Sequence, residues 1–124
     1  GIDLSEEAIK TTKEWLEKEG LKANIKKSDM LQLPYPKESM DCILCRNVIS
    51  HTDTEGIKII IEQIYNILRK NGECFLTLGS KNAETFKNKN NPRKDANTAI
   101  RMDEGPEKRG TTFLCRYGNN TRII

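Results

Sequence analysis

The stretch that decides the fold is Ser28–Leu78, which reads SDMLQLPYPKESMDCILCRNVISHTDTEGIKIIIEQIYNILRKNGECFLTL. It contains an apolar run, Met40–Cys45, a polar turn, an amphipathic segment and a second apolar run, Cys74–Leu78. Apolar residues in the amphipathic segment recur at the spacing of a buried helix face. They are Ile57, Ile60, Ile61, Ile64 and Leu68. A strand, a helix and a second strand in this order predict a parallel βαβ unit.

The residues before this stretch predict a second unit of the same kind. Gly1–Leu4 is typical of the end of a strand, and Ser5 suits the N-cap of a helix over Glu6–Glu19. Gly20 fits the helix terminus, and Asn24–Ser28 indicates a short strand. Together the two units predict an α/β fold with a mostly parallel sheet and flanking helices.

Local signals add detail to this prediction. Thr52 and Glu55 have the spacing of a capping box, and Gly72 stands where a left-handed helix cap is expected. The nearly continuous apolar character of Met40–Cys45 predicts a strand covered on both faces. After Gly79 the chain becomes rich in Lys, Asn and Arg. We therefore expect a solvated loop or mobile lid over Lys81–Asp95, and then one further strand over Thr111–Tyr117.

Composition limits the possible classes of protein. The chain has 124 residues, a net charge of +3, 31% charged residues and a mean hydropathy of -0.68, which favour one soluble domain. No apolar run approaches the length of a membrane span, and no secretory leader is evident, so we expect a cytoplasmic protein with no membrane partner. The mild positive charge is weak support for nucleic-acid binding, which we do not expect.

The cysteine and histidine content does not predict a metal site. Four cysteines occur in the chain, three of them in or beside apolar runs where a free thiol acts as a small hydrophobe. Cys42 and Cys45 form a C-x-x-C, but residues three apart on a strand point to opposite faces. There is no second such pair, and His51 is the only histidine.

Two acidic residues follow predicted strands and are candidates for ligand binding. Asp3 lies at the carboxyl end of a strand and directly before a helix, where an acid in dinucleotide-binding folds accepts hydrogen bonds from ribose hydroxyls. Its alternative role is charge complementation of the helix N-terminus. Asp29 could accept from an exocyclic amine such as that of adenine, beside Met30, or could simply close an Asx turn.

A further polar group follows the strand Met40–Cys45. Asn47 can present a donor and an acceptor together, and His51 could act as a base near neutral pH. We favour a pocket-lining role for Ser50 and His51 over a catalytic one, because no third member of a nucleophilic triad is identifiable. No catalytic residue is assigned.

In their order and spacing these segments resemble class I S-adenosylmethionine-dependent methyltransferases, most closely the small-molecule branch known as type 11 or UbiE-like. The likeness covers roughly residues 1–80 and rests on five short motifs. They are Gly1–Ser5, Ser28–Met30 with Leu33-Pro34, Met40–Leu44, Asn47–Thr52 and Leu68–Gly72. The resemblance implies a Rossmann-like sheet, S-adenosylmethionine as the cofactor and a small-molecule methyl acceptor.

The resemblance also implies roles for individual residues. Asp3 would bind the cofactor ribose, with Leu4 on the adenine face. Asp29 would meet the adenine amine, with Met30 beside the ring. The other implied positions are Arg46 and Asn47 near the methionine portion, and Val48, Ser50 and His51 at the acceptor pocket.

One departure from the family pattern shapes the remaining expectations. The family's first strand and its glycine-rich loop are missing, so residues 1–80 would form a partial cofactor-binding domain, with residues 81–124 as a lid and extra strand of the same domain. We expect a fragment truncated at its N-terminus that binds cofactor weakly alone. Its incomplete sheet could pair with another chain in a homo- or hetero-oligomer. A non-catalytic partner subunit and a nucleotide-binding domain are the alternatives.

Overall fold

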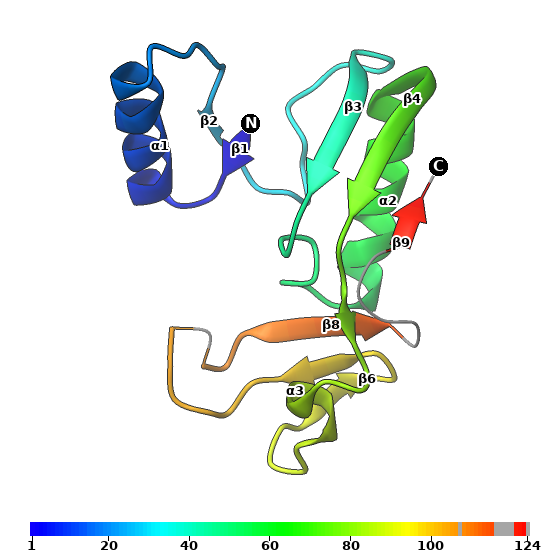
Figure 1. The fold of residues 1–124 in the computed structure, drawn as a ribbon. Coiled ribbons are helices and arrows are strands. Elements are labelled where there is room, and N and C mark those ends of the chain that lie inside the picture. Colours follow the sequence, from blue (N-terminus) through cyan, green and yellow to red (C-terminus); the bar gives the residue numbers. More distant parts are fainter. Residues whose placement is uncertain (107, 116–120, 124) are drawn as a thin grey trace. The chain divides into compact units, whose positions relative to one another are not determined.

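The computed structural model describes residues 1–106, 108–115 and 121–123, the last three by their backbone alone. The chain divides into two compact units, Gly1–Tyr35 and Pro36–Ile124. Figure 1 shows the helices and strands of both.

The first unit is a strand, a helix and a strand. Strands β1 (Ile2–Asp3) and β2 (Lys26–Lys27) are parallel, with Ile2 paired to Lys26. Helix α1 (Glu6–Lys18) lies between them in sequence and buries Ile9. The predicted N-cap is confirmed, because the Ser5 hydroxyl oxygen accepts a hydrogen bond from the Ala8 N–H at 3.2 Å.

The second unit begins with the predicted βαβ arrangement. Strands β3 (Met40–Cys45) and β4 (Leu68–Leu76) are parallel, and helix α2 (Thr54–Ile67) connects them. The parallel pairing and the α/β class predicted from sequence are confirmed. Strand β9 (Thr121–Ile123) adds an antiparallel neighbour on the other side of β4. Buried side chains between α2 and the sheet form the core. They include Ile57, Ile60, Ile64, Ile67, Cys74 and Leu76.

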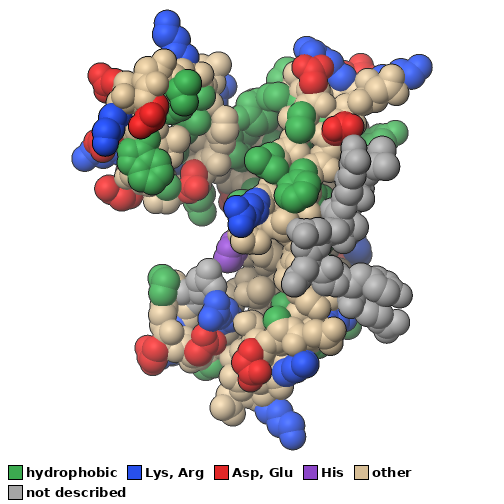
Figure 2. Space-filling view, in the orientation of Figure 1, with side chains coloured by type: hydrophobic (Ala, Val, Ile, Leu, Met, Phe, Trp, Pro, Cys, Tyr) green, Lys and Arg blue, Asp and Glu red, His purple; other side chains and the backbone are tan. Residues whose placement is uncertain are grey.

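The prediction that β3 is covered on both faces is wrong within this unit. Helix α2 covers one face, and the opposite face leaves Leu44 70% exposed and Phe75 39% exposed. These two residues are paired across β3 and β4, so their side chains share the uncovered face. The apolar run therefore predicts the strand correctly, but it does not predict how many faces of the strand are covered in this unit. Figure 2 shows such hydrophobic side chains at the surface.

The ends of α2 differ from the sequence prediction. The N-cap is Asp53, whose carboxylate accepts from the Gly56 N–H at 2.9 Å, so the helix does not use the predicted Thr52–Glu55 capping box. At the other end the C-cap is Leu68, which is extended with φ -66°, so the predicted cap at Gly72 is wrong. The left-handed residue nearby is Asn71, with φ 65°, and it lies within β4. Strand β4 follows α2 without a loop, because Leu68 is both the helix C-cap and the first strand residue.

After Gly79 the chain builds a small four-stranded sheet in the order β5-β8-β7-β6. Its elements are β5 (Gly79–Ser80), α3 (Glu84–Lys87), β6 (Arg93–Asp95), β7 (Thr98–Ile100) and β8 (Thr111–Cys115). The predicted loop over Lys81–Asp95 is wrong in part, since it contains α3 and β6. The predicted strand from Thr111 is confirmed as far as Cys115, and its last two residues lie outside the described residues. Ala99 and Leu114 are buried in this sheet and form its apolar centre.

No helix in the described part of the chain has both the length and the apolar character that a bilayer crossing demands. Within the same residues no three or more His, Cys, Asp and Glu side chains gather as a metal site would require. All four cysteines are free thiols.

Candidate functional site

The two acidic candidates of the first unit lie at the same edge of its strand pair. Asp3 is the last residue of β1, and Asp29 follows the end of β2 by two residues. The strands are parallel and the Ser28 N–H donates to the Asp3 carbonyl oxygen at 3.0 Å. Both carboxylates therefore follow the carboxyl ends of adjacent strands, which is where open α/β sheets bind ligands.

Each of these carboxylates also closes a local turn. Oδ1 of Asp3 accepts from the Ser5 N–H, and Oδ1 of Asp29 accepts from the Leu31 N–H, both at 2.8 Å. Both residues are exposed. A carboxylate offers about four acceptor positions, so a turn that uses one oxygen leaves the other available for ligand donors. The turn role and the ligand role are compatible.

Apolar side chains accompany the two acids. Leu4 follows Asp3 and is 65% exposed, and Met30 follows Asp29 and is half-buried. An acceptor-only carboxylate beside an apolar surface suits the sugar and the flat base of a nucleoside. A sugar needs hydrogen-bond acceptors for its hydroxyls, and a base needs apolar cover for its faces.

The remaining candidates belong to the second unit and follow β3. Arg46 is exposed, and Asn47 adopts a left-handed conformation with φ 55°. The Asn47 N–H donates to Thr77 Oγ1 at 2.6 Å, and the Thr77 hydroxyl donates to Asn47 Oδ1 at 2.9 Å. These bonds hold the amide side chain of Asn47 at the carboxyl end of the neighbouring strand β4.

Sequence analysis missed Thr77. It is 8% exposed and follows the last residue of β4 directly. The signal that could have found it is a hydroxyl residue inside the apolar run Cys74–Leu78, one residue after the end of its strand, where Asn47 stands two residues after the end of β3.

The predicted acceptor-pocket residues lie in the turn between β3 and α2. Val48 is 48% exposed and His51 is exposed, shown in purple in Figure 2. Ser50 is 9% exposed, and its carbonyl oxygen accepts from the Phe113 N–H of β8 at 2.8 Å. The turn is therefore held from one side by the small sheet, while the side chains of Val48 and His51 face solvent.

A second unpredicted feature joins the small sheet to α2. Asp95 accepts from the Thr54 hydroxyl at 2.8 Å, the Thr54 N–H at 3.2 Å, the Asn97 N–H at 2.8 Å and the Thr98 hydroxyl at 2.8 Å. Burial acts to raise the pKa of Asp95, but these hydrogen bonds outweigh it and hold the pKa well below its usual range. Asp95 thus anchors the β6–β7 hairpin to the first turn of α2, close in sequence to Ser50 and His51.

An ion pair reinforces this anchor. Lys94 Nζ lies 2.5 Å from Asp53 Oδ2, which is the N-cap carboxylate of α2. The hydrogen bond from Lys94, followed by that from Gly56, lowers the pKa of Asp53. Neighbouring residues of β6 therefore bind both the cap and the first residue of the helix.

Comparisons with solved structures describe the wider fold. An S-adenosylmethionine-dependent methyltransferase from Methanosarcina mazei matches 92% of this chain with a TM-score of 0.72 at 18% identity. Another from Clostridium acetobutylicum matches 79% with a TM-score of 0.64 at 20% identity. PKMT2 from Rickettsia typhi, solved in complex with AdoHcy, matches 64% with a TM-score of 0.58 at 26% identity. The Rossmann-like methyltransferase fold predicted from sequence is confirmed by these matches.

The matched regions are parts of longer proteins. This chain spans 60%, 41% and 16% of the lengths of the three neighbours, respectively. No curated protein sequence matches the chain. The sequence profile described as a methyltransferase domain matches residues 1–72, which include every candidate residue above except the newly identified Thr77 and Asp95. This match covers more than half of the chain, and the chain belongs to the methyltransferase domain family.

Proposed function

We propose that this chain is part of an enzyme that transfers a methyl group from S-adenosylmethionine to a small molecule. The observation that carries the proposal is the placement of Asp3 and Asp29 after the carboxyl ends of two adjacent parallel strands. S-adenosylmethionine is the methyl donor of the fold's neighbours, and one of them was solved with the demethylated cofactor bound.

In this proposal the two acids recognise the adenosine part of the cofactor. The Oδ2 atom of Asp3 accepts from the ribose hydroxyls, and the Oδ2 atom of Asp29 accepts from the exocyclic amine of adenine. Leu4 and Met30 cover the faces of the base. Arg46 and Asn47 receive the methionine portion, and the bonds to Thr77 orient the Asn47 amide.

Methyl transfer places modest demands on the remaining residues. A nucleophilic atom of the acceptor forms a bond to the methyl carbon while the carbon–sulfur bond breaks. The products are methylated acceptor, S-adenosylhomocysteine and, for a neutral acceptor that carries hydrogen, a released proton. The sulfonium is already a good leaving group, so alignment of the acceptor with the methyl group supplies much of the rate enhancement. Val48, Ser50 and His51 border the acceptor in this proposal.

The proposal includes a cytoplasmic location and a partner chain. Free thiols at Cys42 and Cys45 suit a reducing compartment. In the described part of the chain β3 pairs with β4 alone, so its other edge offers unpaired backbone groups to a further strand from another chain. Sedimentation of the purified chain tests the second point, and a monomer at all concentrations would contradict self-pairing.

Titration with S-adenosylhomocysteine, followed by amide chemical shifts of the isotope-labelled full chain, tests the cofactor site. This readout detects weak binding, which is what we expect of the chain alone. We expect the largest shifts at the amides of Ser5 and Leu31, because both are hydrogen-bonded to the proposed ligand carboxylates. Shifts confined to other regions, or none at millimolar ligand, would overturn the proposal.

Matched variants sharpen the test. Asp3→Asn and Asp29→Asn retain an oxygen that can accept in each local turn but remove the charge, so we expect each to weaken binding about tenfold. Glu7→Gln makes the same change at an exposed residue of α1 and should leave binding unchanged. Equal effects of all three substitutions would show a general charge effect and not a site.

A further inference from the structure

The turn between β3 and α2 depends on other segments for its conformation. We call residues 48–53 the acceptor turn, because Val48, Ser50 and His51 are proposed above to border the methyl acceptor. Within the turn, the His51 N–H donates to the Val48 carbonyl oxygen at 3.1 Å. A segment without helix or strand structure loses conformational entropy at each residue when it is ordered, so contacts with its neighbours must compensate.

The small sheet contacts the acceptor turn at two places. In the middle of the turn, the Phe113 N–H of β8 donates to the Ser50 carbonyl oxygen at 2.8 Å, beside Ile49, which is 1% exposed. At the end of the turn, Lys94 Nζ of β6 lies 2.5 Å from the Asp53 carboxylate. Two strands of one sheet therefore hold points of the turn that are three residues apart.

Asp95 joins the small sheet to the residue that follows the turn. Its carboxylate accepts two hydrogen bonds from Thr54 and two from the sheet, which come from the Asn97 N–H and the Thr98 hydroxyl. The Asn97 side-chain amide also donates to the Thr54 hydroxyl oxygen at 3.3 Å, and the Asn97 carbonyl oxygen accepts from the Leu114 N–H at 2.8 Å. Hydrogen bonds to a carboxylate are stronger than those between neutral groups, so Asp95 is the firmest of these links.

These contacts form a closed network around the turn. From Ser50 the network passes through β8 to Asn97, then to Asp95, and returns to the chain at Thr54, four residues after Ser50. We call it the Asp95 network. His51 lies in the stretch of chain that the network encloses, so the position of Thr54 against the small sheet limits where His51 can lie.

We propose that Asp95 is a positioning residue for the methyl acceptor, which acts by holding Thr54 and so fixes the acceptor turn against the small sheet. The inference rests on the proposed function, in which His51 borders the acceptor. Asp95 has no contact with the acceptor in this proposal. Alignment of the reacting atoms supplies much of the rate of methyl transfer, and a displacement of about 1 Å can cost about 100-fold. If Asp95 only stabilised the fold, its removal would leave the turn of the folded chain unchanged.

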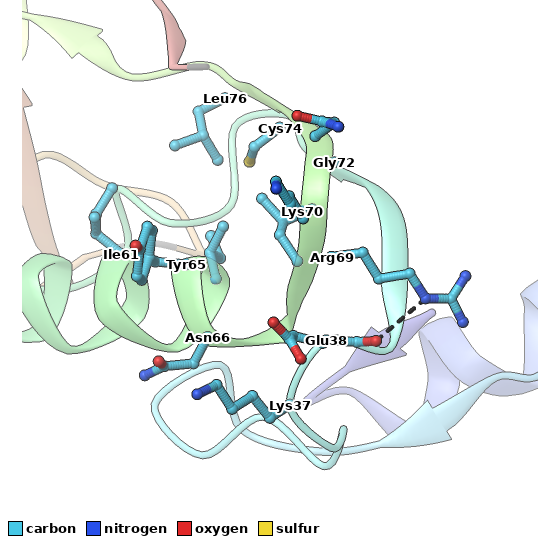
Figure 3. Close-up of a pocket in the computed structure, with 13 residues that line it drawn as sticks. Lys37, Glu38, Ile61, Tyr65, Asn66, Arg69, Lys70, Gly72, Cys74 and Leu76 are labelled. Carbon is cyan, nitrogen blue, oxygen red and sulfur yellow. Dashed lines mark hydrogen bonds between the residues drawn. The ribbon is translucent and has the colours of Figure 1, made fainter.

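Variants at Thr54 and Asp95 separate the two roles. Thr54→Val keeps the shape of the side chain but removes the hydroxyl that donates to Asp95, whereas Thr54→Ser keeps that hydroxyl. Asp95→Asn removes the charge. Ile64→Val is the control for lost stability, because it shortens a buried side chain of the same unit. Ile64 lines the pocket between α2 and β4 that Figure 3 draws, and no residue of the Asp95 network lines that pocket.

His51 provides a direct probe of the turn. It is the only histidine in the chain, so its imidazole gives a single set of signals in the NMR spectrum of the isotope-labelled full chain. At one pH and temperature, we expect Thr54→Val and Asp95→Asn to shift these signals. Both variants should also raise hydrogen exchange at the His51 and Phe113 amides at least about tenfold relative to amides in the middle of α2. Thr54→Ser and Ile64→Val should have neither effect.

A purely structural role for Asp95 would give a different result. It would lower the stability of Thr54→Val and Asp95→Asn but leave the His51 imidazole signals and the relative exchange rates as they are in Ile64→Val. That result overturns the proposal. Equal effects of Thr54→Val and Thr54→Ser also overturn it, because the serine variant retains the hydroxyl bonded to Asp95.

Titration with S-adenosylhomocysteine distinguishes failure of this inference from failure of the proposed function. The amides of Ser5 and Leu31 report the cofactor site in the first unit. Their shifts should follow the same binding curve in Thr54→Val as in the unchanged chain, within about twofold in Kd. A larger loss of affinity in Thr54→Val contradicts a role limited to the acceptor turn. An unchanged chain that gives no such shifts contradicts the proposed function, and the His51 signals still decide whether Asp95 positions the turn.

Discussion

Asn47 and Thr77 are joined by two hydrogen bonds that run in opposite directions between neighbouring strand ends. The N–H of Asn47 donates to the Thr77 hydroxyl oxygen, and that hydroxyl donates to the Asn47 side-chain oxygen. Asn47 has a φ of 55°, a left-handed conformation that is uncommon for residues other than glycine, and the two bonds hold it there. The pair couples the ends of β3 and β4 within the second unit.

Replacement of Thr77 tests this coupling. Thr77→Val keeps the shape of the side chain but leaves the Asn47 N–H and amide oxygen without their partner, so we expect a loss of about 1–3 kcal/mol in unfolding free energy. Thr77→Ser retains the hydroxyl and should lose less. Urea denaturation followed by circular dichroism measures both. A valine variant as stable as the serine variant would show that the hydroxyl contributes nothing.

Asp95 should make stability depend on pH. Its pKa in the folded chain lies below the ordinary value of 3.8, so its contribution is complete above that value and is lost as the pH falls through the lower folded pKa. Asp95→Asn should therefore cost about 1–2 kcal/mol at pH 7 and flatten the loss of stability in acid.

Unfolding free energies between about pH 7 and pH 2 check this prediction. Asp103→Asn is the control, because the Asp103 carboxylate pairs with Arg101 at the surface, where an ion pair contributes about 0–1 kcal/mol. If both variants behave alike, the Asp95 hydrogen bonds do not hold the small sheet to α2.

Gly56 should resist substitution by alanine. In a helix this change normally stabilises by about 1 kcal/mol. Here a Cβ at position 56 would lie 2.0 Å from Oγ1 of Thr52, a contact that requires Thr52 to move. We expect Gly56→Ala to destabilise the chain by about 1–3 kcal/mol. The double variant with Thr52→Gly should recover much of the loss in thermal unfolding. A stabilised single variant would disprove the close contact.

The cysteines should differ in reactivity towards alkylating agents. Burial, followed by the charges of Cys45 and Cys42, raises the pKa of the Cys74 thiol to about 11, so it stays protonated and unreactive at pH 8. Cys42 is exposed and should be alkylated first. Mass spectrometry after timed exposure to iodoacetamide measures the order. Urea should abolish the difference, and early modification of Cys74 in the native chain would contradict the burial of β4.

Sequence analysis predicted those helices, strands and caps that depend on residues close together in the chain. The isoleucine spacing gave α2, and the apolar run gave β3 with the bounds observed, Met40–Cys45. Ser5 was identified as a cap because a hydroxyl before two glutamates at a helix start has one main structural use. The observed cap, Asp53, was missed because Thr52 and Asp53 are neighbours, and both are good N-cap residues.

Apart from β8, the small sheet that begins at Gly79 could not be predicted in this way, because its stability comes from contacts between distant segments. Strands β6 and β7 have three residues each, which is too short for an alternating pattern to be recognised. Asp95 holds them to Thr54, which lies 41 positions earlier in the chain. The roles of Asp3 and Asp29 in binding stay predictions, since the structure supplies their positions and not their ligand.

The register of β4 constrains how the gene can change. Pairing with β3 is irregular between Leu68 and Glu73 but continuous over Glu73–Leu76. Deletion of the Glu73 codon would shift the strand residues that follow by one place, which exchanges the inward and outward faces of this segment. Cys74 and Leu76 would turn towards water, and Phe75 would turn towards the helix. Natural length variation should therefore be rare within Glu73–Leu76 and commoner in the exposed turn around Lys89 and Asn90.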